Sequence, residues 1–318
     1  PATAVLTDVT VSGRVINFGR TTLTSFPLAD RINDGELGNE TFFRKIDPGD
    51  TVVLENPTYL GALQAWRAYE PRFVGVPTDE DGIRLDALEE ALQKHAPKLL
   101  YLLPNFQNPS GATLSELRRQ RIVELTCRHQ VAILEDDPYG QLRFEGDHLT
   151  PLFVLDRERG SRPSGAPEQH TLYVGTLSKL LAPGLRIGWI VGPETVIASL
   201  VQMKQGTDLH TGTLAQILAY EVCKGGFLDR HVRELREVYR VRRDAMLECL
   251  AAHMPPGVRW TRPEGGLFLW VTLPADLDAR VLLRRALEHQ VAFVPGPSFF
   301  AGSGGQNTLR LNFSYSTP

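Results

Sequence analysis

Short apolar runs alternate with amphipathic stretches between residues 51 and 191, and this alternation constrains the fold more than any other feature. Lys98–Leu103 is nearly all apolar, as expected of a strand that is buried on both faces of a parallel sheet. Between such runs lie helix-like stretches such as Asp86–His95, whose apolar residues recur at helical spacing. Strands that alternate with helices predict an α/β fold with a doubly wound, mainly parallel sheet.

The same reading gives approximate limits for the other elements. Further strands are expected at Thr51–Glu55, Arg72–Val76, Val131–Leu134, Thr171–Gly175 and Ile187–Val191. Further helices are expected from Leu60 to Ala68 and, capped by Ser115, from there to about His129. Each predicted strand is short, which is typical of the central strands of an α/β sheet.

The sequence pattern changes near residue 197, and a chain of 318 residues exceeds the ~250–300 residues at which one core usually splits. Helical patterns dominate from Ala198 to Ala252, and the stretch Phe227–Cys249 within them is long and rich in charge. They are followed by the expected elements Phe268–Leu273 (strand), Ala279–His289 (helix), Ala292–Val294 (strand) and Thr308–Phe313 (strand). We therefore expect a large domain over residues 42–205. Residues 1–41 and 206–318 would form an N-terminal segment and a smaller α+β domain.

Composition excludes several classes of protein. A net charge of −3 without a long basic run argues against a nucleic-acid partner. No apolar stretch approaches the ~18 residues of a membrane span, and the N-terminus lacks a signal-peptide pattern. Three widely spaced cysteines predict neither a disulfide framework nor a metal site. We therefore expect a cytoplasmic protein with no membrane association and no metal.

Polar side chains gather where the predicted strands end. Asn105–Gly111 and Glu135–Gly140 each follow a buried strand, and Thr176–Lys179 follows another. Because ligands of doubly wound sheets bind beyond the carboxyl ends of the strands, these clusters should converge on one site.

The third cluster has a distinctive chemistry. Lys179 lies in a hydroxyl-rich turn with Thr176 and Ser178, and Arg186 follows the lysine by seven residues. A lysine placed there can form a Schiff base with an aldehyde, while hydroxyls and a guanidinium can hold a phosphate. Pyridoxal 5′-phosphate carries both groups, so the turn predicts a site for this cofactor.

The stretch Thr176–Trp189 resembles the lysine motif of the class I and II aminotransferases, which are pyridoxal-phosphate-dependent transferases of fold type I. Asn108-Pro-Ser-Gly and Asp136-x-x-Tyr139 resemble two further motifs of that family. Asn56–Tyr59 and Arg262–Gly266 are similar to the subgroup of the 2-aminoadipate aminotransferases and MocR-type regulators. The resemblance runs from about residue 43 to residue 314, which is most of the chain.

The resemblance implies a role for each site residue. Lys179 would hold the cofactor as a Schiff base and later move a proton, and Asp136 would keep the pyridine nitrogen protonated. Tyr139 and Asn108 would contact the phenolic oxygen of the cofactor. The remaining assignments are the phosphate ligands Thr176, Ser178 and Arg186, and the substrate-binding residues Arg310, Asn108 and Gly19.

Each of these residues also has an ordinary structural explanation. Asn108–Gly111 alone would be a turn, and Asp136 could cap a strand end. Arg310 lies in an alternating strand, where an arginine usually faces solvent. The joint occurrence of the motifs, in the order and spacing of the family, favours the functional interpretation.

The function implied is transfer of an amino group from an L-amino acid to a 2-oxo acid such as 2-oxoglutarate. The donor would be 2-aminoadipate, glutamate, or an aromatic or branched-chain amino acid, and the enzyme would be a homodimer. Two alternatives stay open: the sensor domain of a MocR-type regulator, and another pyridoxal-phosphate reaction. Decarboxylation is disfavoured, because the match at Arg310 implies that the substrate carboxylate is held.

The sequence also departs from the family pattern. Members carry a Gly/Ser-rich turn that binds the cofactor phosphate at a helix N-terminus, and residues 32–43 offer no such turn. Relative to the family pattern, residues are missing between about 20 and 42. We hypothesise that the sequence joins pieces of a longer protein.

Overall fold

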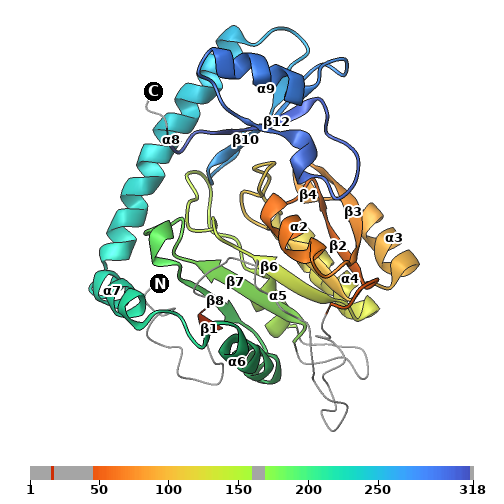
Figure 1. Cartoon of the computed structure of the whole chain (residues 1–318), viewed down its shortest axis with the longest axis vertical. Coiled ribbons are helices and arrows are strands. Elements are labelled where there is room, and N and C mark those ends of the chain that lie inside the picture. Colours follow the sequence, from red (N-terminus) through yellow and green to blue (C-terminus); the bar gives the residue numbers. More distant parts are fainter. Residues whose placement is uncertain (1–15, 18–45, 160–168, 316–318) are drawn as a thin grey trace.

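The computed structural model of the chain describes residues 16–17, 46–159 and 169–315. Its larger sheet has the strand order β1-β8-β7-β6-β5-β2-β3-β4 (Figure 1). The central strands β3, β2, β5, β6 and β7 run parallel to one another, whereas β8 is antiparallel to β7. Two short strands, β1 and β4, pair antiparallel at the edges. The predicted doubly wound, mainly parallel sheet is therefore confirmed.

Six strands of this sheet lie close to their predicted positions, whereas the short edge strands β1 and β4 were not predicted. Their limits are β1 Ile16–Asn17, β2 Thr51–Asn56, β3 Arg72–Asp79, β4 Gly82–Ile83, β5 Leu99–Leu102, β6 Ala132–Asp136, β7 Thr171–Thr176 and β8 Gly188–Val191. Apolar and β-branched residues dominate the central strands, as a sheet covered on both faces requires.

Helices connect the strands and cover the sheet. Their limits are α2 Leu60–Arg67, α3 Leu85–His95, α4 Glu116–His129, α5 Leu152–Arg157, α6 Glu194–Asp208, α7 Thr213–Cys223, α8 Phe227–His253 and α9 Ala279–Glu288. As predicted, Ser115 caps α4, and its Oγ accepts a hydrogen bond from the amide of Arg118 at 3.4 Å. None of the described helices combines the length and apolarity needed to cross a membrane.

The two faces of the large sheet bury separate clusters, because side chains alternate along each strand. Val53, Leu100 and Ile133 pack with apolar residues of α3 and α4 on one face. Leu54 and Leu134 face the opposite way, toward α2, α6, α7 and the start of α8. The molecule around the sheet is thus built in three layers.

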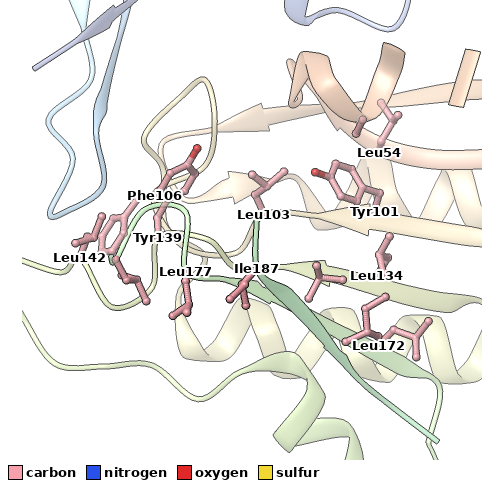
Figure 2. Packing of buried hydrophobic residues seen from close by; sticks show 14 of the residues in the cluster. Leu54, Tyr101, Leu103, Phe106, Leu134, Tyr139, Leu142, Leu172, Leu177 and Ile187 are labelled. Atoms are coloured by element: carbon pink, nitrogen blue, oxygen red, sulfur yellow. The ribbon is translucent and has the colours of Figure 1, made fainter. Parts of the chain in front are cut away.

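The second cluster continues beyond the strand ends into the loops that follow them. Figure 2 shows Leu54, Tyr101, Leu134 and Leu172 from neighbouring strands together with side chains from the following loops. The loop residues of the same cluster are Phe106 after β5, Tyr139 and Leu142 after β6, and Leu177 after β7. Apolar packing therefore fixes the loops in which the candidate site residues lie.

A smaller antiparallel sheet lies on the side of these loops. The long helix α8 joins it to the large sheet (Figure 1). Its order is β11-β12-β10-β9, with the limits β9 Arg259–Trp260, β10 Phe268–Thr272, β11 Val294–Pro295 and β12 Thr308–Asn312. Leu269 of β10 packs against Leu247 and Leu250 of α8. Phe268 points the other way and joins the core of the large sheet.

The region between the sheets differs in detail from the sequence prediction. The helical stretch Ala198–Ala252 divides into α6, α7 and α8, with breaks at Gly212 and at Gly225–Gly226. The predicted domain boundary at residue 205 falls inside α6, whose Ile197 and Leu200 are buried in the core of the large sheet. The limits of the two domains therefore stay a prediction.

Candidate active site

Asp136 is the last residue of β6 and is 3% exposed. The hydroxyl of Tyr101, from the neighbouring strand β5, donates a hydrogen bond to Asp136 Oδ2 at 2.7 Å. The Tyr101 ring is itself held edge-on against Trp66, with 5.1 Å between the ring centroids. Burial raises the pKa of Asp136 to about 7, and the Tyr101 hydrogen bond opposes that rise. This carboxyl group therefore changes charge near neutral pH.

Three predicted residues form a continuous chain of contacts between the two sheets. Arg310 Nη1, from β12, donates a hydrogen bond to Asn108 Oδ1, in the loop after β5, at 2.7 Å. The Asn108 side chain also hydrogen bonds to the Tyr139 hydroxyl, which follows β6. Burial raises the pKa of Tyr139, so the phenol stays protonated at neutral pH. The structure thus brings together Arg310 and Asn108, which are 202 positions apart in the sequence.

Arg310 is held over aromatic rings rather than in solvent. Its guanidinium carbon lies 4.0 Å from the centroid of Phe268 and 5.1 Å from that of Phe299. The Nε atom is buried and has no hydrogen-bond partner within the part of the chain that the structure describes. A half-buried guanidinium with an unused donor is suited to a carboxylate, because the fork geometry allows two parallel hydrogen bonds.

Lys179 lies in a tight turn after β7. The amide of Leu177 donates a hydrogen bond to Ile187 O at 3.1 Å. The amide of Ser178 donates one to Thr176 Oγ1 at 3.0 Å. Partial burial lowers the pKa of Lys179, and the positive charges of Arg310 and Arg186 lower it further. A lower pKa increases the neutral fraction of the amine, which is the form that attacks an aldehyde.

The predicted phosphate ligands are placed differently from one another. Thr176 is buried, and its hydroxyl hydrogen bonds with Ile187 O and with Ser178 Oγ, both at 2.9 Å. Thr176 thus stabilises the turn, and contact with a phosphate would require an exchange of one of these bonds. Arg186 is exposed, directly follows the 3₁₀ turn Pro183–Leu185 and lies near Lys179, whose pKa it affects. Ser178 and Arg186 are the better placed of the three.

One predicted site residue, Gly19, lies outside the described residues. The same applies to residues 32–43, where the phosphate-binding turn of the family is absent from the sequence.

The sequence analysis missed Tyr101 and assigned no role to Tyr59. Tyr59 directly precedes α2, and its phenol is close enough to affect the pKa values of Tyr139 and Arg310. A signal for Tyr101 was present, because a hydroxyl in an otherwise apolar buried strand needs a hydrogen-bond partner.

The residues present fit pyridoxal 5′-phosphate. Lys179 offers an amine of lowered pKa for the aldehyde, and the buried carboxyl of Asp136 suits a protonated ring nitrogen. Tyr139 and Asn108 offer hydrogen-bond donors at the loops that follow β6 and β5. Among the described residues, Ser178 and Arg186 are the candidates for the phosphate. Fold and side chains together are those expected of the class of pyridoxal-phosphate-dependent transferases of fold type I.

Comparison with known proteins identifies the family. Residues 35–318 match the model of the class I and II aminotransferases, and the chain belongs to this family. The resemblance that the sequence analysis found, and the cofactor pyridoxal 5′-phosphate that it implied, are thereby confirmed.

Individual relatives agree with this assignment. The chain is 46% identical over 275 residues to an aromatic-amino-acid aminotransferase of Thermococcus litoralis, covering 85% of this chain and 64% of the relative. It is also 46% identical over 269 residues to the 2-aminoadipate transaminase of Thermus thermophilus, covering 85% of this chain and 66% of that protein. The chain thus spans just under two thirds of these relatives.

A solved structure shows the same fold over almost the whole chain. The kynurenine aminotransferase of Pyrococcus horikoshii superposes with a TM-score of 0.85 at 38% identity, covering 98% of this chain and 74% of that one. A more distant relative is an uncharacterised HTH-type transcriptional regulator of Bacillus subtilis. It is 34% identical over 269 residues, covering 84% of this chain and 53% of the regulator.

Proposed function

We propose that the protein is an aminotransferase that moves an amino group from an L-amino acid to a 2-oxo acid. The observation that carries the proposal is the contact chain Arg310–Asn108–Tyr139, next to Lys179. The site combines a half-buried cation that has an unused donor with an amine of lowered pKa. The higher identity to aminotransferases than to regulators also supports a catalytic role.

When bound, pyridoxal 5′-phosphate supplies an electron sink for the bond that breaks at the substrate Cα. The ionised Asp136 would hold the ring nitrogen in its protonated form. Lys179 would hold the cofactor through its amine and would accept the proton of the substrate Cα. Tyr139 and Asn108 would hydrogen bond to the phenolic oxygen of the ring.

Arg310 binds the substrate α-carboxylate through two parallel hydrogen bonds, one of which uses the free Nε donor. Phe268 and Phe299 exclude water from one face of the guanidinium, which strengthens the interaction. Because this arrangement holds the carboxylate, it disfavours decarboxylation.

For the donor we propose 2-aminoadipate, glutamate, or an aromatic or branched-chain amino acid, and for the acceptor a 2-oxo acid such as 2-oxoglutarate. The names of the Thermococcus and Thermus relatives support aromatic amino acids and 2-aminoadipate. The alternative is the cofactor-binding sensor domain of a transcription regulator, which the 34% identity to such a protein supports.

We further propose a large domain over residues 42–205, a smaller one built from residues 1–41 and 206–318, and a cytoplasmic location. The free thiols of Cys127, Cys223 and Cys249 are consistent with a reducing compartment. We also propose a homodimer. Helix α7 supports it, because this helix exposes the large apolar residues Leu214, Ile217 and Leu218.

The test is the visible absorbance spectrum of the purified protein with pyridoxal 5′-phosphate, before and after addition of 2-aminoadipate or glutamate. We expect a band from lysine-bound cofactor that disappears as the amino acid converts the cofactor to pyridoxamine 5′-phosphate. Lys179→Ala should show no such band. Lys224→Ala, which alters a half-exposed lysine after α7, should behave like the wild type.

The outcomes separate the two functions. A Lys179-dependent band that no amino acid changes would favour the sensor. A band that persists in Lys179→Ala would contradict the assignment of the Schiff-base lysine.

A further inference from the structure

Arg119 of α4 is completely buried, which is rare for an arginine. Its guanidinium donates to oxygen atoms in three directions. Nε donates to Leu114 O at 2.9 Å, and Nη1 to Thr150 O at 3.2 Å. Nη2 donates to Pro104 O at 3.0 Å and to Asn105 Oδ1 at 2.6 Å. A single side chain thus fastens segments that follow two different strands.

Most of these hydrogen bonds go to the loop that carries Asn108. Pro104 and Asn105 begin this loop after β5, and Leu114 ends it before α4. Within it, the amide of Leu114 donates to Pro104 O at 2.9 Å, and that of Gly111 to Gln107 O at 2.6 Å. The loop is therefore a compact unit, and Arg119 holds both of its ends.

Arg119 also reaches the segment after β6. Asn105, which accepts from Arg119, places its amide nitrogen against Gly140, where an added Cβ would lie 2.9 Å away. Gly140 directly follows Tyr139. The carboxyl groups of Glu135 and Asp137 also lie near the guanidinium. The two residues that Asn108 joins, Arg310 and Tyr139, thus meet a loop whose position depends on Arg119.

We propose that Arg119 is a positioning residue for the substrate-carboxylate site: it sets the place of Asn108 between Arg310 and Tyr139 without touching the substrate. The proposal rests on the proposed function for the role of Arg310. A lysine cannot replace the arginine, because one ammonium group cannot reach acceptors spread around a planar fork.

The adjacent Arg118 provides a matched control. Its side chain donates to a carboxylate and two carbonyls: Asp79 Oδ1 at 2.6 Å, and Gly82 O and Ile83 O at 3.2 Å each. These acceptors belong to β3 and β4 and not to the loop after β5. Arg118→Lys therefore removes side-chain hydrogen bonds from the same helix but none to the loop after β5.

The experiment compares Arg119→Lys with Arg118→Lys by hydrogen exchange of peptides over residues 104–114 and by steady-state kinetics. In Arg119→Lys we expect exchange in this loop to rise about tenfold or more. The KM for the amino acid should rise by a similar factor, and more than kcat falls, because a looser grip on the carboxylate affects bound substrate and transition state alike. In Arg118→Lys, both quantities should stay within about twofold of the wild type.

Asn105→Ala removes one acceptor and leaves the other three partners of Arg119, so it serves if Arg119→Lys does not fold. Asn105→Ala should raise the hydrogen exchange of the loop and the KM in the same direction, but by less than Arg119→Lys does. The proposal would be overturned if hydrogen exchange over residues 104–114 were the same in Arg119→Lys and Arg118→Lys. An unchanged KM in a folded Arg119→Lys would also overturn it. If the wild type transfers no amino group, the proposed function fails instead, and the exchange comparison still decides whether Arg119 orders the loop.

Discussion

At the scale of single residues, the candidate site depends on polar groups whose partners come from other elements. Asp136 shows this most clearly, because burial raises its pKa to about 7 while the Tyr101 hydroxyl opposes the rise. The charged form is the one that can hold a protonated ring nitrogen. Cofactor binding should therefore strengthen as pH rises through about 7, as Asp136 loses its proton.

Tyr101→Phe tests this relation. Loss of the hydroxyl removes a hydrogen bond that favours the charged carboxylate, so the pKa of Asp136 should rise further. We expect the pH midpoint of cofactor affinity to move upward, by up to about one pH unit for a bond worth ~1.4 kcal/mol. The measurement is the Kd of pyridoxamine 5′-phosphate between pH 5.5 and 8.5, since this form of the cofactor carries no aldehyde for Lys179.

Two variants control the experiment. Asp136→Asn cannot ionise and should lose this part of the pH dependence. Tyr173→Phe removes a similar hydroxyl that donates to Asp137 at 3.1 Å, and it should shift the midpoint less than Tyr101→Phe does. An unchanged midpoint in Tyr101→Phe would mean that the hydroxyl does not stabilise the Asp136 carboxylate.

At the scale of elements, the loop after β5 is also held in place by Gly266, which lies in the segment before β10. Gly266 has a φ of +73°, and a Cβ at this position would lie 2.5 Å from Phe106 Cβ. Phe106 is buried, and the guanidinium of Arg143 lies 4.9 Å from its ring centroid. Only glycine satisfies both the backbone conformation and the close approach.

Gly266→Ala should therefore destabilise the protein by about 2–4 kcal/mol, from left-handed backbone strain together with overpacking against Phe106. Gly206→Ala is the control: it lies in α6, has a negative φ and meets nothing within 4 Å. It should stabilise the protein by about 0.5–1 kcal/mol, because alanine favours a helix. Denaturant unfolding measures both, and equal stability of the two variants would contradict the packing argument.

The elements also show how far the sequence could predict this structure. Buried strands such as Leu99–Leu102 were found because uninterrupted apolar runs have few other uses. The long helix α8 was indicated by the stretch Phe227–Cys249, whereas the separation of α6 from α7 at residues 209–212 was not predicted. Motifs predicted Asp136, Tyr139 and Asn108.

Arg119 was missed for a different reason. It lies in the helical run Glu-Leu-Arg-Arg-Gln-Arg, in which every charge resembles a surface charge. Only the tertiary structure shows that one of these arginines is buried against carbonyl groups. Hydrogen-bond partners of this kind depend on which loops meet, and no local pattern encodes that.

At the scale of the whole molecule, α7 combines little charge with several exposed large apolar residues. Its one charged residue is Glu221, whereas Leu214 is 71% exposed and Ile217 53%. A contiguous exposed apolar surface of this kind marks an interface. Helix α7 also contacts the 3₁₀ turn Pro183–Leu185, which directly precedes Arg186. A second copy seated on α7 would therefore lie close to Arg186, one of the proposed phosphate ligands.

The homodimer can be tested by placing charges on this helix. We expect the wild type to have twice the mass of one chain in light scattering at micromolar concentration, and Leu214→Glu/Ile217→Glu to be monomeric, because buried unpaired carboxylates oppose association. Leu117→Glu is the control, since Leu117 on α4 is 76% exposed and distant in sequence from α7. The monomeric variant should also bind pyridoxamine 5′-phosphate more weakly, as the turn before Arg186 loses its support. A monomeric wild type, or a dimer that the α7 charges leave intact, would refute the interface; a monomer with unchanged affinity would separate the dimer from the site.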